Sequence, residues 1–399
     1  MNSGVLTPNR WLILLVLTLA RFTMGFQFQS LAAVGPALTT ETAISYTALG
    51  TLMGIYLLPG AFFAIPSGWL GKRFGDKRLV MIGLTVMTGG GALFATSHVY
   101  EVMLAGRLIS GAGAVLLNVL VTKMVTDWFT GHRIVTAMGI LISSWPLGIA
   151  LALLTMGPLT EVMGLSWAFA IPVAVCALAL LLVAIVYTSP GAVKADEGNS
   201  NEKAIGGLSS FELWGVVLGG CVWCFYNVAF ILPLSFGPEF LTAQGMGLAA
   251  AGAIVSLTSW LIIPALPLGG WFAEHIGRPI ATMVVSFIAI AIVIWMIPLT
   301  SSYALMFAIL GLIFGPAGGM IMALPTQVLR DENRAVGMGI FFTVYYIGMG
   351  IFPAIAGYIR DVSGSPAAPF WFAGIMILVA MLALIGFRIL CVRNLRYLR

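Results

Sequence analysis

Charged residues are scarce in this chain. Only 8% of its 399 residues are Asp, Glu, Lys or Arg, whereas 60% are hydrophobic. Soluble domains are about a quarter charged and about half apolar, so this composition excludes a water-soluble protein. The apolar stretches are continuous rather than alternating, which excludes an outer-membrane barrel. Because a membrane helix and its connection take about 30 to 35 residues, the chain is long enough for about twelve crossings.

Cysteine and histidine are also few, with four and three residues. The cysteines, Cys176, Cys221, Cys224 and Cys391, lie in apolar segments or at the end of one, without a histidine or carboxylate beside them. We interpret them as structural thiols rather than a redox or metal pair. The chain also lacks a phosphate-binding glycine loop, a nucleophile triad and metal-ligand spacing. The sequence therefore predicts no cofactor, no metal and no enzymatic activity.

Apolar windows divide the chain into six spans, a polar break and six further spans. The break, residues 188–210, is rich in Gly, Ser, Asn and mixed charges, which is typical of a flexible linker. We expect an all-α membrane protein with an N-terminal six-helix bundle over 1–187, a cytoplasmic linker over 188–210 and a C-terminal six-helix bundle over 211–399. The expected spans are 11–33, 47–68, 79–97, 102–125, 134–157, 166–187, 211–236, 248–270, 280–299, 303–327, 335–357 and 369–390.

Basic residues mark one side of these predicted helices. If the N-terminus lies in the cytoplasm, most of the 19 Lys and Arg residues fall in cytoplasmic connections or tails. The exceptions are Arg360, on the opposite side, and Arg21 and Arg107, within helices. Because cytoplasmic loops carry an excess of positive charge, this distribution predicts that both termini are cytoplasmic.

Two sequence patterns occur once in each half of the chain. The segment Gly68–Gly75, after the second predicted helix, has its counterpart in Gly270–Gly277, after the eighth, 202 residues later. The tripeptide Met138–Ile140 recurs as Met338–Ile340, 200 residues later. Two offsets that agree this closely favour duplicated six-helix units over chance matches.

These residues resemble the major facilitator superfamily of secondary transporters, over essentially the whole chain. The cytoplasmic loop signature of that superfamily, Gly-x-x-x-Asp-Arg-x-Gly-Arg-Lys, is matched by Gly68, Arg73, Gly75, Lys77 and Arg78. Its fourth-helix signature, Arg-x-x-x-Gly-x-Gly, is matched by Arg107, Gly111 and Gly113.

The resemblance implies twelve transmembrane helices in two pseudo-symmetric six-helix bundles. It further implies a monomer in a lipid bilayer, with a small-molecule substrate and no nucleic-acid partner. Short loops and no appended domain resemble a prokaryotic carrier, so we expect a multi-pass protein of the bacterial inner membrane.

The loop signature departs from the superfamily at one position. Lys72 stands where the signature has Asp, whereas Glu274 keeps an acid at the equivalent position of the second half. Asp127 with Arg133, and Asp331 with Arg334, could still bridge helix ends. The candidate gating and loop residues are Gly68, Arg73, Gly75, Asp127, Arg133, Glu274, Gly277 and Arg334.

Arginine is the ionisable residue predicted at membrane depth. Arg21 sits about 15 Å into the first helix, near the middle of a hydrocarbon layer about 30 Å thick, and no acid is predicted at the same depth. Arg107 lies nearer the start of the fourth helix, on a face that continues through Gly111 and Asn118. A charge in the bilayer is costly, so each is a candidate for function.

The resemblance implies that the first and fourth helices line a central cavity. Two guanidinium groups facing that cavity, without buried carboxylates, would give it a positive potential and favour an anion. A planar guanidinium can hold a carboxylate through two hydrogen bonds. The alternatives are that Arg107 serves packing or gating or pairs with Glu101, and that Arg21 bonds to carbonyls or glutamines.

The second half offers polar-tipped aromatic residues within its spans. Tyr226 and Asn227 lie in the seventh helix with Trp223, and Tyr345 and Tyr346 lie in the eleventh. Aromatic residues in membrane helices also serve as packing or interface anchors. The candidate substrate-binding residues are Arg21, Gln29, Arg107, Asn118, Tyr226, Asn227, Tyr345 and Tyr346.

The sequence therefore favours a secondary active transporter of a small organic anion, namely a carboxylate, working by alternating access. The sequence leaves three modes open, namely exchange with a counter-anion (antiport), symport with a coupling proton, and uniport. One alternative is proton-coupled efflux of drugs or other hydrophobic compounds, which would require a buried acid. A second alternative is a non-transporting membrane sensor on the same scaffold, although such proteins usually append a soluble domain.

Overall fold

The computed structural model describes residues 9–63, 73–129, 133–188 and 207–397, apart from the side chains of 135, 272–274, 276 and 394–397. Within these ranges, eleven helices are long and apolar enough to cross a membrane. The helices of the first half are α1 (Arg10–Ala33), α2 (Gly35–Thr42), α3 (Tyr46–Gly54), α4 (Gly60–Phe63), α6 (Asp76–Ala95), α7 (Tyr100–Trp128), α8 (Ile134–Met163) and α9 (Leu165–Val186).

The second half contains α10 (Ser210–Ala243), α11 (Leu248–Ile276), α12 (Pro279–Met296), α13 (Tyr303–Met322), α14 (Arg334–Ser363) and α15 (Ala368–Tyr397). Short 3₁₀ turns, η1 (Ile297–Leu299), η2 (Leu324–Gln327) and η3 (Asp331–Asn333), follow or precede these helices. The all-α membrane fold expected from the sequence is confirmed. Most of the expected linker lies outside the described residues.

The second expected span, 47–68, is interrupted. It consists of α3, a turn over 55–59 and the short helix α4, and its last residues lie outside the described ranges. Pro59 has no backbone N–H and cannot donate to the carbonyl of Ile55, so the regular helical ladder ends there. The turn instead closes with shorter-range bonds, such as Gly60 N–H to Leu57 O at 3.0 Å.

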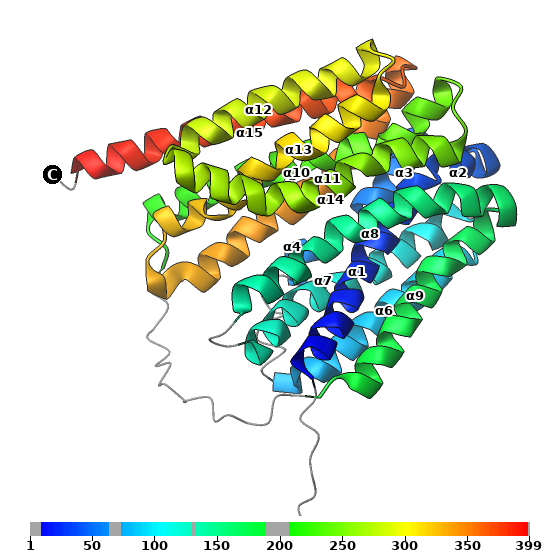
Figure 1. Cartoon of the computed structure of the whole chain (residues 1–399), viewed down its shortest axis with the longest axis horizontal. Helices are drawn as coiled ribbons and strands as arrows, with labels where there is room; N and C mark the ends of the chain where they lie inside the picture. The colour runs from blue at the N-terminus through cyan, green and yellow to red at the C-terminus, as the bar shows by residue number, and fades with distance from the viewer. Residues whose placement is uncertain (1–8, 64–72, 130–132, 189–206, 398–399) are drawn as a thin grey trace, which may run out of the picture.

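The helices form two bundles that diverge toward one side of the molecule (Figure 1). In the first half, α1 packs against α8 and α9, and α6 packs against α7 and α9. In the second half, α10 packs against α14 and α15, and α11 packs against α13. We call the side where α1 begins and α15 ends the termini side, and the opposite side the far side (Figure 1).

The two bundles meet through α3 with α14 and through α8 with α11. Glycines permit this approach: a Cβ on Gly50 would collide with the carbonyl of Pro353, and one on Gly252 with the carbonyl of Leu153. These positions are related by the same offsets of about 200 residues that the sequence patterns show. We call the far-side portions of the pairs α3 with α14 and α8 with α11 the far-side gate. In this gate the backbone of one half lies directly against the backbone of the other, so the two halves are closed against each other on the far side.

Candidate functional site

Arg21 lies in the middle of α1, at the contact of three helices of the first half. Its Nε donates to Oδ1 of Asn118 on α7 at 3.0 Å. Its Nη1 donates to the carbonyl oxygens of Leu141 and Ile142 on α8, at 2.8 and 3.2 Å. The guanidinium is therefore held in one orientation by two neighbouring helices.

The acceptor on α8 follows from the local sequence. Ile142 lies four residues before Pro146, which has no N–H to donate to the Ile142 carbonyl. That carbonyl is left without its helical partner and accepts from Arg21 instead. A proline within a membrane helix thus supplies a polar acceptor at the depth of the arginine.

No carboxylate of the described residues forms an ion pair with Arg21. Its Nη2 makes no hydrogen bond with a described residue and is not enclosed by protein atoms, and the side chain as a whole is part-buried. The expected bonding to carbonyls is present. It leaves one edge of the guanidinium available and its positive charge uncompensated.

The structure brings residues of α14 close to this arginine. Tyr345 and Tyr346 both lie within electrostatic range of Arg21, and Tyr346 also lies near the side chain of Asn118. The two tyrosine rings are 4.9 Å apart. Four of the predicted substrate-binding residues, two from each half, therefore lie together.

Aromatic rings extend the site into the second half. Trp223 of α10 lies 6.2 Å from the ring of Tyr345 and 6.4 Å from that of Phe341. Its indole Nε1 is enclosed and has no hydrogen-bond partner among the described residues. Sequence reasoning noted Trp223 but did not include it among the binding residues. Its spacing of four residues from Asn227 was the signal that could have found it.

Asn227 and Tyr226, adjacent in sequence, face different environments. Asn227 is part-buried one turn beyond Trp223, and its Nδ2 donates to the Trp223 carbonyl at 2.7 Å. Tyr226 is buried, and its hydroxyl donates to the carbonyl of Phe314 within the second half. The structure therefore places Asn227 beside the aromatic group and directs Tyr226 into the packed bundle.

Arg107 lies apart from Arg21, inside the first bundle. It is only 2% exposed and donates to three backbone carbonyls: Leu52, Gln27 and Phe28, at 3.0, 3.0 and 3.2 Å. Its guanidinium also lies 4.5 Å from the ring of Tyr56. These contacts join α7 to α1 and α3, so in this conformation Arg107 has the surroundings of a packing residue.

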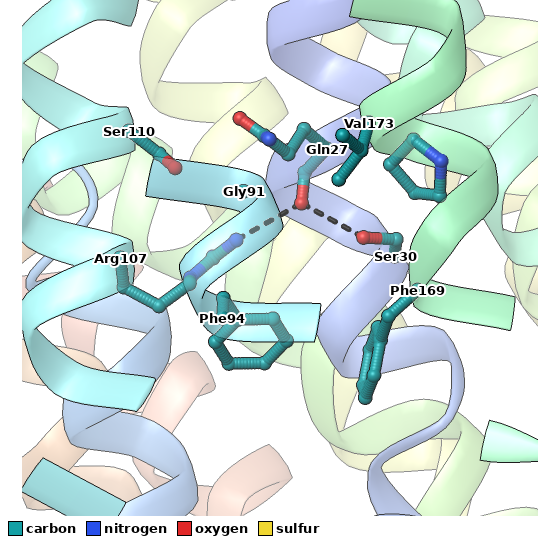
Figure 2. Close-up of a pocket in the computed structure, with 9 residues that line it drawn as sticks. Gln27, Ser30, Gly91, Phe94, Arg107, Ser110, Phe169 and Val173 are labelled. Carbon is teal, nitrogen blue, oxygen red and sulfur yellow. Dashed lines mark hydrogen bonds between the residues drawn. The ribbon is translucent and has the colours of Figure 1, made fainter. Parts of the chain in front are cut away.

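A small cavity with polar and apolar walls lies beside Arg107, with space for about one water molecule. Figure 2 shows the carbonyl oxygen of Gln27 accepting hydrogen bonds from both Arg107 and Ser30. Ser110 also lines the cavity. The expected alternative partner, Glu101, is exposed at the start of α7 and forms no ion pair with Arg107.

Gln29 connects the two halves. Its Nε2 donates to the carbonyl of Leu234 on α10 at 2.8 Å, and its side chain is fully buried. Leu234 lies four residues before Pro238, so its carbonyl also lacks a helical partner. Gln29 thus takes part in the closed contact between α1 and α10.

The predicted loop residues lie on the termini side. Gly75 and Gly277 both adopt positive φ, +85° and +65°, which favours glycine at each equivalent turn. Arg133 also has a positive φ, at the start of α8, and lies over the ring of Trp11. Arg73 is exposed beside Phe74. Gly68 and the side chain of Glu274 are outside the described part of the chain.

Ion pairs on the termini side join helix ends within each half. Lys123 pairs with Asp76 and lies 4.0 Å from Asp127. The expected pair of Arg334 with Asp331 is present at 2.8 Å. Sequence reasoning missed Glu212, which accepts from Arg330 at 3.0 Å; the hydrogen bond to Glu212 raises the pKa of Arg330.

Comparison with known proteins places these features in a family. The profile of the Major Facilitator Superfamily matches residues 17–353 and 218–393. A hexuronate transporter of Bacillus subtilis is 21% identical, over 94% of this chain and 94% of its own. The 4-hydroxybenzoate transporter PcaK of Pseudomonas aeruginosa is 30% identical over 160 residues, which cover 36% of this chain and 35% of PcaK.

The fold is also shared with a solved structure. The inward-facing, occupied structure of a bacterial homolog to the human lysosomal transporter Spinster matches with a TM-score of 0.76 and 15% sequence identity. The match covers 97% of this chain and 97% of the other. At this identity the likeness concerns the fold alone.

Proposed function

The chain belongs to the Major Facilitator Superfamily, and we propose that it carries a small, ring-bearing organic carboxylate across a bacterial inner membrane by alternating access. Its family and its relatives make it a membrane transporter of small molecules and not an enzyme. The resemblance drawn from the loop and fourth-helix signatures is confirmed.

The observation that carries the proposal is the uncompensated charge of Arg21. A guanidinium at membrane depth is costly, and no described acid pairs with it. Asn118 and the α8 carbonyls are neutral and fix its orientation without cancelling its charge. An anion that binds at the free Nη2 edge would supply the missing negative charge and a charge-assisted hydrogen bond.

The surroundings of Arg21 favour a ring-bearing carboxylate. The hydroxyl of Tyr345 forms no hydrogen bond with a described residue and is not enclosed, so it can donate to a substrate. The rings of Trp223 and Tyr345 offer flat apolar faces on the opposite half. The two relatives named above transport a sugar acid and an aromatic acid, which both combine a ring with a carboxylate.

The closed far side supports alternating access. The two halves touch at the far-side gate and diverge toward the termini side (Figure 1). With both termini in the cytoplasm, as the distribution of basic residues predicts, the diverging ends of the two halves would face the cytoplasm. Rocking of the halves about Arg21 and Tyr345 would expose the same residues to each side in turn.

Efflux of hydrophobic cations receives no support from this site. Such a reaction would require an acid facing the substrate, whereas the described polar groups near Arg21 are an amide, hydroxyls and backbone carbonyls. A lipophilic cation would be repelled by the guanidinium.

The decisive experiment is ligand-induced stabilisation of the purified protein. D-glucuronate and 4-hydroxybenzoate should raise the Tm, because a ligand that binds only the folded state stabilises it by about 2.7 kcal/mol at a hundred times its Kd. Their uncharged methyl esters and a lipophilic cation such as tetraphenylphosphonium should not. The Arg21→Gln variant should fold and lose the response to the acids. A full response in that variant, or a response to the cation alone, would remove Arg21 from anion binding.

Transport in proteoliposomes then separates the modes of coupling. Uptake of a labelled acid is measured with a pH gradient in one set of vesicles and with an excess of unlabelled acid inside another set. Acceleration by the pH gradient identifies proton coupling, and acceleration by the internal acid identifies exchange.

A further inference from the structure

The far-side gate contains two acids that cap helices of the opposite half. Asp361, at the end of α14 in the second half, accepts from the backbone N–H groups of Tyr46 and Thr47, at 2.9 and 2.8 Å. These residues form the first turn of α3, in the first half. Glu161, at the end of α8 in the first half, accepts from the backbone N–H of Ala249, in the first turn of α11, at 3.2 Å.

The two contacts are related by the internal repeat. Glu161 and Asp361 are 200 residues apart, and the helices that they cap begin at Tyr46 and Leu248, 202 residues apart. Each half therefore supplies an acid to the other half at an equivalent position. The same cross-half arrangement, found twice, argues against a chance surface contact.

Electrostatics favours both contacts. The first N–H groups of a helix have no partner within the helix and carry the positive end of its dipole. In α3, the Ser45 side chain caps the helix by accepting from the N–H of Ala48. Asp361 accepts from the N–H groups of Tyr46 and Thr47, which Ser45 leaves without a partner. A carboxylate at this position supplies both hydrogen bonds and favourable charge.

Further contacts hold the start of α3 against α14. The guanidinium of Arg360 lies 4.5 Å from the ring of Tyr46 and pairs with Glu239 on α10 at 2.8 Å. Thr47 adds a hydroxyl hydrogen bond to Asp361 at 2.5 Å. A Cβ on Gly357 would collide with the Tyr46 carbonyl, so the two main chains are in direct contact. The pair of Arg360 with Glu239 lies within the second half and holds the guanidinium in place, whereas the contacts of Tyr46 and Thr47 with α14 join the halves and would separate if the far side opened.

We propose that Asp361 and Glu161 are positioning residues for transport, a symmetric pair of acid caps that stabilises the far-side-closed conformation by capping helices of the opposite half. They do not touch the substrate site, and their role holds whatever the transported molecule is. In the open state, water can bind the N–H groups that these acids cap in the closed state. Removal of the acids would therefore destabilise the closed state alone and favour far-side opening.

The experiment measures the distance across the far side directly. Val99 and Ser301 are exposed on opposite halves, in the far-side connections before α7 and α13. Spin labels are attached through Val99→Cys and Ser301→Cys in the full chain whose four native cysteines are replaced, and the distance distribution is recorded by pulsed electron paramagnetic resonance. The labelled protein with both acids intact should show mainly the short distance between labels that is expected for the closed gate.

The cap variants should add a longer distance to this distribution. We expect the ratio of open to closed molecules to rise about five-fold for Asp361→Ala, about two-fold for Glu161→Ala, and about ten-fold for both together. Asp361→Asn keeps an acceptor and should give a smaller rise than Asp361→Ala. Glu101→Ala is the matched control, because Glu101 is an exposed far-side acid at the start of α7 that forms no ion pair with a described residue of the other half.

Hydrogen exchange distinguishes opening from a local effect of each substitution. Asp361→Ala should accelerate amide exchange not only in residues 45–52 but also in residues 246–252, around the N–H of Ala249 that Glu161 caps. Glu161→Ala should accelerate exchange in 45–52 in return. The proposal is overturned if the double variant retains the unaltered distance distribution, or if each substitution changes exchange only in the helix that it caps.

Discussion

The Nε of Arg21 donates to Oδ1 of Asn118 at 3.0 Å, and this bond joins α1 to α7 in the middle of the first bundle. The bond uses an inner edge of the guanidinium and leaves Nη2 without a described partner. The arginine is therefore both oriented and available. This combination distinguishes Arg21 from Arg107, whose three donating nitrogens all bond to carbonyls.

Removal of the orienting amide should weaken anion binding. In Asn118→Ala, Nε loses its acceptor and the guanidinium loses the contact that fixes its plane, so we expect the Kd for 4-hydroxybenzoate or D-glucuronate to rise about ten-fold, equivalent to about 1.4 kcal/mol. Isothermal titration calorimetry measures the change. Ser143→Ala is the control, because its hydroxyl bonds only to Gly139 within α8. Unchanged affinity in Asn118→Ala would show that the orientation of Arg21 does not depend on this amide.

The two tyrosine hydroxyls should have different effects. Tyr345→Phe removes a hydroxyl that has no described partner and lies near Arg21, so affinity for the carboxylate should fall about five-fold with little change in Tm. Tyr226→Phe removes a buried hydroxyl bonded to Phe314, so the Tm should fall while affinity is retained. Paired binding and melting measurements on both variants check this. If instead Tyr226→Phe lowered the affinity and Tyr345→Phe lowered the Tm, the substrate would lie beside Tyr226.

Arg107 should contribute to stability rather than to anion affinity. Arg107→Gln leaves the carbonyls of Leu52, Gln27 and Phe28 without their donors in a fully buried place, so we expect unfolding to become easier by about 3 kcal/mol. The exposed Arg78→Gln should have little effect. Denaturation in detergent gives the loss of stability, and titration of the remaining folded protein gives the affinity. A folded Arg107→Gln protein of normal stability that fails to bind would make Arg107 a substrate contact.

A side chain at the far-side gate should prevent its closure. Gly50→Ala places a Cβ against the Pro353 carbonyl, where main chain meets main chain, so the variant should populate the far-side-open conformation and lose transport. Gly139→Ala is the matched control, since a Cβ there meets nothing within 4 Å. Distance measurements between labels on Val99 and Ser301, together with uptake into proteoliposomes, check both changes. Normal closure in Gly50→Ala would mean that α3 and α14 can separate slightly at no cost.

Composition and periodicity are local properties, and they predicted the membrane class, the positions of the spans and the duplication. Helices in lipid must satisfy their own backbone groups, so an apolar run of sufficient length predicts a helix whatever surrounds it. The exception is the span at 47–68, where Pro59 interrupts the ladder and shorter-range turn bonds take its place. Arg21 could be identified from its depth in the first helix alone.

The partners of each polar group could not be predicted in this way. Arg21 and Arg107 are both arginines within predicted helices, yet one has a free edge and the other is enclosed among carbonyls. Tyr226 and Asn227 are neighbours that face different environments. The caps on α3 and α11 join residues more than 80 positions apart, through bonds from Tyr46 to Asp361 and from Ala249 to Glu161.

The sequence by itself thus predicted a duplicated helical membrane transporter with an arginine deep in its first helix. Those properties depend on hydrophobicity, helix length and charge along a single segment. Only the tertiary structure decided which arginine remains available, which proline leaves a carbonyl for it, and which acids lie across the far side. Each of these depends on how helices from different parts of the chain rotate and approach one another, and that is set by packing between segments rather than within them.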